Sequence, residues 1–390
     1  MDTALSATNL SLLRYEPSRQ LGGNGTYSED YENLMRFLKI SSVVFPMVFV
    51  LFLIIGIIGN TLTIYTIAKS KCLSTSPNIL FLNLALSDLI FLAVCVPLQA
   101  AYYGTEYNLL LGDGLCKIFK YTIFVTTGVG GYSLAAICAF RCFAIAKPMR
   151  CGMVLTKRRV KMVIISIWIS LLLVNTPIAI YYMEHQGVAC SPVFEFQYQT
   201  TVFVVITTAA DVLVPLLILF IASMCIVVAL RKRDISIESF SEEELAEQSK
   251  KQTMKQMILV VSVALVFCVC WVPFTMITIV CALGVGPKGI TYIIISSTAQ
   301  LLAFSNSCIN PIVYNFVSKE FRQGFRQVSD SARWAALRFM RRFSSHESTR
   351  TNTSVSTPHV CHDVKNDNFG IATRTTGSRD TRVPEHIVLG

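Results

Sequence analysis

The sequence has 390 residues, of which 53% are hydrophobic and only 15% are charged, whereas soluble domains carry about 25% charged residues. The formal net charge of +10 is compatible with nucleic-acid binding, but the basic residues flank long apolar runs, so nucleic acid is excluded as a partner. Most of the thirteen cysteines lie inside apolar runs, and none has the paired spacing of a zinc site, so no metal centre is predicted.

The N-terminal segment 1–42 is polar and lacks the apolar core of a signal peptide. We predict that it is an extracellular tail and that the first apolar span acts as its own insertion signal. Two Asn-x-Ser/Thr sequons, at Asn9 and Asn24, are expected to be glycosylated on that side.

Seven apolar stretches follow, and each reaches the roughly 20 residues of helix that a bilayer core requires. They are predicted at 43–68, 78–102, 117–146, 161–182, 201–230, 254–283 and 290–316. The fold class is therefore an all-α membrane protein, with a bundle of seven transmembrane helices over residues 43–316.

Lysine and arginine concentrate in alternate loops, which sets the orientation of the bundle. Basic residues are frequent at 69–71, 147–159 and 231–255, but the opposite loops contain few, at Lys117, Lys120 and Lys288. We expect a multi-pass plasma-membrane protein with an extracellular N-terminus.

Three segments on the expected cytoplasmic side are predicted to differ in structure. Residues 231–255 are acidic in the middle, and we interpret them as a solvated helical extension of the sixth span. Phe321, Phe325 and Val328 repeat at helical spacing, which predicts a short amphipathic interfacial helix over 317–328. Residues 329–390 are predicted to be a disordered tail.

Several polar residues interrupt the apolar spans, and such residues are functional candidates because lipid disfavours them. The polar-core candidates are Asn60, Asp88, Asn306 and Ser307. Proline occurs at 215, 273 and 311, where it frees a backbone carbonyl and kinks a helix. Each proline taken alone favours a simple packing kink.

Taken together, these residues form an ordered set. The set comprises Gly59-Asn60, residues 84–88 (Leu-Ala-Leu-Ser-Asp), Cys116, Arg141, Trp168, Pro215, residues 270–274 (Cys-Trp-Val-Pro-Phe) and residues 310–314 (Asn-Pro-Ile-Val-Tyr). It resembles the rhodopsin-like family of G-protein-coupled receptors over roughly residues 43–328. The resemblance implies a non-enzymatic receptor that binds an extracellular ligand and activates a heterotrimeric G protein.

The resemblance also implies roles for individual residues. Cys116 is expected to form a disulfide with Cys190 in the second outer loop, and Trp271 resembles the switch residue beneath the ligand pocket. The candidates for activation and G-protein coupling are Arg141, Pro273, Asn310, Pro311 and Tyr314.

The sequence departs from the family pattern at several positions. Phe140 replaces the acid that usually precedes the arginine, and Ser223 replaces a tyrosine of the fifth span. Leu109 replaces a common tryptophan of the first outer loop. The only cofactor suggested is a sodium ion near Asp88, and Gly130, where a serine is frequent, weakens that expectation.

The candidate ligand-binding residues are Gln99, Ile123, Trp271 and Phe304. Ile123 stands where monoamine receptors have an aspartate, and Phe304 stands where visual pigments have the retinal lysine, so both ligand classes are disfavoured. Residues 96–100 (Val-Pro-Leu-Gln-Ala) resemble the outer part of the second span in receptors for galanin, allatostatin A and kisspeptin. This resemblance implies a neuropeptide ligand. Pro97 is also a common kink in peptide and chemokine receptors, and that second interpretation stays open.

Two other functions remain as alternatives. Phe140 and Ser223 are compatible with a receptor-like protein that binds ligand without driving a G protein. A transporter is less favoured, because no repeat relates the two halves of the chain. The tail is expected to bind arrestin after phosphorylation by receptor kinases, because serine and threonine cluster in residues 344–357.

Overall fold

The computed structural model describes residues 26–69, 76–146, 150, 152–153, 155–185, 189–237, 243–319, 321–328, 330, 333 and 338. The chain divides into a unit Met1–Arg333, which contains all the elements below, and a unit Trp334–Gly390, in which only Arg338 is described. The sequons at Asn9 and Asn24 and the serine-rich tail lie outside the described residues.

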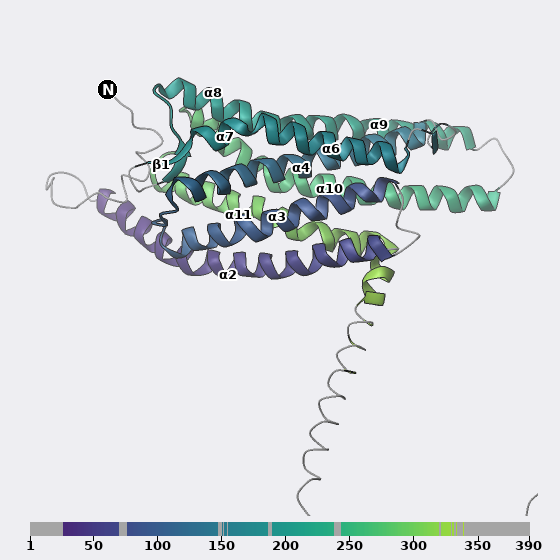
Figure 1. The fold of residues 1–390 in the computed structure, drawn as a ribbon, viewed down its shortest axis with the longest axis horizontal. Coiled ribbons are helices and arrows are strands. Elements are labelled where there is room, and N and C mark those ends of the chain that lie inside the picture. The colour runs from purple at the N-terminus through teal and green to yellow at the C-terminus, as the bar shows by residue number, and fades with distance from the viewer. Residues whose placement is uncertain are drawn as a thin grey trace, which may run out of the picture. The chain divides into compact units, whose positions relative to one another are not determined.

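Within the described residues, seven helical spans that are long and apolar enough to cross a membrane lie side by side (Figure 1), which confirms the predicted bundle. The elements are α2 (Thr26–Lys69), α3 (Ser76–Gly104), α4 (Gly112–Ala146), α6 (Lys157–Val174), α7 (Thr176–Tyr181), α8 (Gln197–Thr208), η2 (Ala209–Leu213), α9 (Val214–Ile237), α10 (Glu243–Ala282) and α11 (Gly289–Val317). Helix α4 lies at the centre and packs against α3, α6, α9 and α10.

The first helix begins much earlier than predicted. It starts at Thr26, so residues 26–42 of the expected tail 1–42 are helical. Leu34 and Leu38 in this extension are 8% and 3% exposed, and they pack with Tyr103 and Tyr107 at the outer end of the bundle. Burial of these leucines favours continuation of the helix beyond the length that the membrane requires.

The fourth span is not the single helix predicted over 161–182. Helix α6 ends at Val174, and α7 starts at Thr176 after Asn175. Pro177 explains the break, because proline has no N–H and its ring would clash with the carbonyl of residue 173 in a continuous helix. The Asn175 amide Nδ2 donates to the Leu171 carbonyl at 3.0 Å and closes the end of α6.

The fifth span contains one wide turn, η2, immediately before Pro215. The Val214 N–H donates to the Ala209 carbonyl, five positions earlier. Because the Pro215 ring would clash with the carbonyl of residue 211 in a regular helix, the chain widens there. The wide turn places Asp211 inside the bundle, where the side chain is 1% exposed.

A β-hairpin covers the outer end of α4. Strands β1 (Tyr182–His185) and β2 (Ala189–Pro192) are antiparallel, and Glu184 is opposite Cys190. Cys190 forms the predicted disulfide with Cys116, with a Cα–Cα distance of 5.5 Å. The bond fixes β2 to the first turn of α4.

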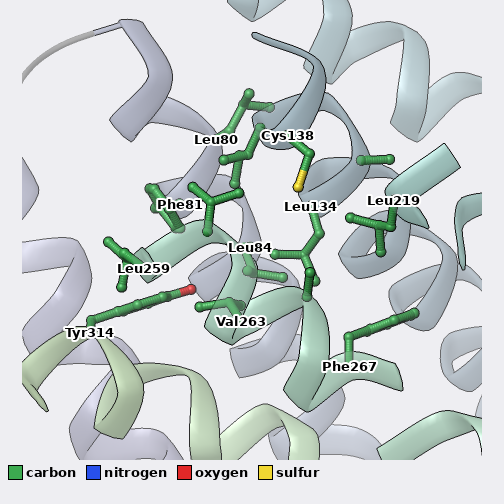
Figure 2. Packing of buried hydrophobic residues seen from close by; sticks show 14 of the residues in the cluster. Leu80, Phe81, Leu84, Leu134, Cys138, Leu219, Leu259, Val263, Phe267 and Tyr314 are labelled. Carbon is green, nitrogen blue, oxygen red and sulfur yellow. The ribbon is translucent and has the colours of Figure 1, made fainter. Parts of the chain in front are cut away.

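The inner half of the bundle contains a hydrophobic core contributed by several helices. Figure 2 shows Leu80, Leu84, Leu134, Val263 and other side chains converging there. Most carry no polar atoms, so their burial stabilises the inner ends of the helices without requiring hydrogen-bond partners.

The segment after α11 packs on this core. Residues 321–328 are helical, as predicted, and Phe321 is 2% exposed. Its ring lies 5.3 Å from that of Tyr314 and 6.3 Å from that of Phe81. On the same side, α10 begins at Glu243, which confirms a helical extension of the sixth span over 243–255. Residues 231–237 instead continue α9, so the prediction was wrong for that part of 231–255.

Candidate functional site

The outer half of the bundle contains two adjoining cavities, of about 260 and 230 Å³. Volumes of this order approach the lower end of the range of small-molecule and cofactor pockets. The residues that line both cavities are Lys120, Phe274, Tyr292, Ser296 and Gln300. We treat the two cavities as one pocket with an outer and an inner part.

One wall of the outer part is formed by a pair of glutamines from α3 and α11. Gln99 Nε2 donates to Gln300 Oε1 at 3.2 Å, and Gln300 Nε2 donates to Gln99 Oε1 at 3.3 Å. The Tyr103 hydroxyl donates to Gln300 Oε1 at 2.8 Å. The pair satisfies two amides in a largely apolar surrounding, where unpaired amides would be costly.

The rim between α2 and α11 is closed by Tyr107 from the first outer loop. Its hydroxyl lies 3.3 Å from both Ser41 Oγ and Ser297 Oγ. Burial raises the pKa of the Tyr107 phenol above its usual value. Tyr107 has a φ of 67°, an uncommon left-handed conformation for a residue with a side chain.

The mouth of the pocket is organised by Glu184 of the hairpin. Its Oε2 accepts hydrogen bonds from the backbone N–H groups of Leu111 and Gly112, both at 2.6 Å. The Glu184 N–H donates to Asp113 Oδ1 at 3.0 Å. These bonds join β1 to the chain that enters α4, in addition to the disulfide.

The floor of the inner part contains three of the predicted ligand-binding residues. Ile123, Trp271 and Phe304 all line it. Phe304 is 2% exposed, and its ring packs against those of Phe49 and Phe91 at 5.3 and 4.7 Å. Gln99 lines the outer part, so the four candidates surround one pocket, and their contact with ligand stays a prediction.

Asp211 also faces the inner part, from the wide turn η2. Its Oδ1 accepts from Asn175 Nδ2 at 3.1 Å, whereas its Oδ2 has no hydrogen-bond partner among the described residues. Asp211 Oδ1 lies so close to Gly128 that a Cβ there would be 2.9 Å away. Glycine at position 128 therefore leaves the space that the carboxylate occupies.

Below the floor, polar side chains connect α2, α3 and α11. Asn310 Nδ2 donates to Asp88 Oδ2 at 3.0 Å, and Asn60 Nδ2 donates to the Ser307 carbonyl at 2.8 Å. The close approach of α2 requires Gly59, because a Cβ there would lie 2.8 Å from Pro311 Cβ. The predicted polar residues are thus brought together.

Comparison with known proteins agrees with this arrangement. The profile of the family "7 transmembrane receptor (rhodopsin family)" matches residues 59–314. The chain belongs to this receptor family. Its relatives include the allatostatin-A receptor of Bombyx mori, which is 29% identical over 91% of this chain and 96% of the relative. Galanin receptor 2a of Danio rerio is 31% identical over 74% of this chain and 79% of its own. The human galanin receptor type 2 is 30% identical over 74% of this chain and 73% of the relative.

The inner end of the bundle, around Arg141, contains residues at which the sequence departs from the family pattern. Phe140, which replaces the usual acid, is half-buried and packs against the inner hydrophobic core. Tyr314 is fully buried, its ring lies 5.1 Å from that of Phe81, and its hydroxyl has no partner among the described residues.

Several pocket residues were not predicted from the sequence. Lys120 was counted with the basic residues of an outer loop, although the predicted span 117–146 contains it. In the receptor it lies two turns inside α4 and lines both parts of the pocket. Gln300 and Tyr103 were not singled out at all. For Gln300, the available signal was a polar residue within an apolar span, whereas Gln99 had been singled out through the family resemblance of residues 96–100.

Proposed function

We propose that this receptor is a plasma-membrane protein that binds an extracellular peptide and activates a heterotrimeric G protein. The observation that carries the proposal is the similarity to an allatostatin-A receptor over nearly the full length of both chains. The similarity to galanin receptors supports the same ligand class. The basic loops on one side support an extracellular N-terminus.

The shape and lining of the pocket support a peptide ligand. The pocket opens beside the hairpin and combines aromatic walls with a few fixed polar groups, such as the Gln99–Gln300 pair. Amides of this kind can exchange their mutual hydrogen bonds for bonds to a peptide backbone or a side-chain amide. An arrangement of largely apolar walls and few oriented polar groups is typical of specific ligand sites.

Trp271 offers a route from the pocket to the cytoplasmic side. It lines both the floor of the pocket and a small cavity of about 10 Å³ that also borders Asp88. Asp88 is bonded to Asn310, and Pro273 lies in the same helix as Trp271. A ligand that contacts Trp271 differently in two states of α10 would shift their populations. Arg141 and Tyr314 are the proposed responding residues at the inner end.

We also propose that a sodium ion binds beside Asp88. The small cavity there is bordered by Thr127, Gly130, Asn306 and Ser307. Thr127 Oγ1 and Asn306 Oδ1 are buried without hydrogen-bond partners among the described residues. A carboxylate and two unpartnered oxygens suit a hard cation, so the residues present fit the ion even though Gly130 provides no oxygen. The bound ion would supply positive charge beside the buried carboxylate.

The proposed function is tested with the full-length receptor in lipid nanodiscs containing purified heterotrimeric G proteins. Synthetic allatostatin-A and galanin peptides are added, and nucleotide exchange is measured. We expect at least one peptide to accelerate exchange, and Gln99→Leu to weaken the response. Peptide binding without exchange for any G-protein class would favour the alternative of a receptor that does not drive a G protein. If the peptides neither bind nor accelerate nucleotide exchange, the proposal is contradicted.

A further inference from the structure

The most unusual group in the pocket is the ammonium of Lys120, because none of the carboxylates in the described part of the chain pairs with it. We infer that Lys120 binds a carboxylate of the ligand, supplied by a free C-terminus or by an acidic side chain. The inference rests on the proposed ligand-binding function, which it deepens by assigning a chemical class to the ligand.

Lys120 is positioned at the centre of the pocket. It lies four residues after Cys116, one turn further into α4, and borders both the outer and the inner part. Its Nζ lies 5.5 Å from the centroid of the Phe119 ring and 5.8 Å from that of Tyr182. These rings attract the cation without neutralising it, since a cation–π contact contributes only about 0.5–2 kcal/mol.

Neither carboxylate of the pocket wall neutralises Lys120. Glu184 is occupied by the N–H groups of Leu111 and Gly112. Asp211 lies beside Gly128, eight residues further along α4, which corresponds to about 12 Å of helix. Among the described residues, no carboxylate lies within ion-pair distance of the Lys120 ammonium.

A half-buried ammonium beside aromatic rings has lost part of its hydration, and that loss is unfavourable unless an anion compensates for it. A carboxylate that enters the pocket gains a charge-assisted hydrogen bond from a donor that is already oriented. An amine in the same place would be repelled. The arrangement therefore selects for acidic ligands at this depth of the pocket.

The test uses three small probes that share one aromatic group. They are N-acetyl-tryptophan with a free carboxylate, N-acetyl-Glu-Trp-amide with a side-chain carboxylate, and the neutral N-acetyl-Gln-Trp-amide. Thermal stabilisation of the purified full-length receptor in nanodiscs is titrated with each probe. We expect at least one acidic probe to stabilise the receptor at lower concentration than the neutral probe, and the better of the two identifies the source of the carboxylate.

Variants of α4 assign the effect to one side chain. Lys120→Gln should raise the half-maximal concentration of the acidic probe on the order of 30-fold, and Lys120→Arg should preserve the preference for acid. Lys117→Gln, on the same helix but outside the pocket lining, is the matched control and should behave as the native receptor. The inference would be overturned if the neutral probe stabilised the receptor as well as the acidic probes, or if neither acidic probe stabilised it. It would also be overturned if Lys120→Gln left the half-maximal concentration of the acidic probe unchanged.

The readout is independent of G-protein activation. Acid selectivity that depends on Lys120, without nucleotide exchange, would leave the inference standing and contradict the proposed coupling. Peptide-driven nucleotide exchange that is insensitive to Lys120→Gln would support the proposed coupling and contradict the inference about Lys120.

Discussion

Asn310 donates a hydrogen bond to Asp88 at 3.0 Å, although 222 positions separate the two residues along the chain. The bond joins the middle of α3 to the inner half of α11, and both side chains are at most 5% exposed. It therefore connects the element expected to rearrange during activation with the carboxylate of the polar core.

A double-mutant cycle measures the coupling of these two residues. We expect Asp88→Ala and Asn310→Ala each to lower the free energy of unfolding, with a coupling energy of about 1–3 kcal/mol. Thermal unfolding of the two single variants and the double variant in nanodiscs provides the values. Strictly additive effects would mean that the bond contributes nothing to stability.

The disulfide should be essential for folding at the cell surface. Cys116→Ser or Cys190→Ser removes the link between α4 and β2 and is expected to destabilise the receptor by about 2–5 kcal/mol. Surface labelling of intact cells should fall sharply for both variants. Cys225→Ser, at an exposed free cysteine, is the control and should be labelled like the native receptor. Full labelling of both disulfide variants would contradict this prediction.

Gly130→Ser should strengthen sodium binding beside Asp88. A Cβ at position 130 would meet only Leu84 Cδ1, at 3.6 Å, so the added side chain has ordinary contacts. The new hydroxyl adds an oxygen to the cavity that Asp88 borders. We expect the sodium concentration that gives half-maximal thermal stabilisation to fall several-fold, with potassium as the control salt. Equal stabilisation by sodium and potassium in both proteins would count against a sodium site.

Basal signalling tests the role of Phe140. Phe140 offers no carboxylate to Arg141, whereas an acid at position 140 would add a charge-assisted bond of about 1.5–3 kcal/mol. We expect measurable second-messenger production without ligand, and a decrease in Phe140→Asp at equal surface expression. Phe140→Leu is the control, because it keeps an apolar contact with the inner core without adding an acid. Higher basal activity in Phe140→Asp would show instead that Phe140 stabilises the inactive state by packing.

The serine-rich tail should recruit arrestin after phosphorylation. Each phosphate adds about −1.5 to −2 charges. Truncation after Phe343 removes the nine candidate sites of the cluster, which are Ser344, Ser345, Ser348, Thr349, Thr351, Thr353, Ser354, Ser356 and Thr357. We expect agonist-dependent recruitment to fall several-fold in a proximity assay, with nucleotide exchange unchanged. Replacement of the nine residues by alanine in the full chain separates loss of phosphorylation from loss of the tail.

The membrane spans were predictable because their signal is local. A run of about 20 apolar residues is sufficient to identify a span, and the spacing of Phe321 and Phe325 was sufficient for the amphipathic helix. The break at Asn175 was not predicted although the sequence shows Pro177. The apolar run over 161–182 is long enough for one continuous span, and a single proline was not taken as sufficient to end it. The early start of α2 depends on burial of Leu34 and Leu38 against the first outer loop, which no local pattern reveals.

The pocket was only partly predictable, because the direction in which a helical residue points depends on the rotation of the whole helix. Gln99 was recognised by its sequence context. Its partner Gln300 is 201 positions away along the chain, and only the packing of α3 against α11 brings the two side chains into contact. Lys120 was counted with the basic residues of an outer loop although it lies within the predicted span 117–146, and α4 in fact begins even earlier, at Gly112.

The wide turn Ala209–Leu213 adds one residue to the helical count of the fifth span. A single additional residue rotates everything on its outer side by about 100° relative to a regular helix. The side chains of Gln197–Thr208 are therefore out of phase with those after Val214. Insertion or deletion of one codon in this turn would turn a different stripe of α8 toward the ligand while leaving the inner half in register. Evolution of ligand selectivity at this wall could thus proceed by a change of length, with no exchange of side-chain type.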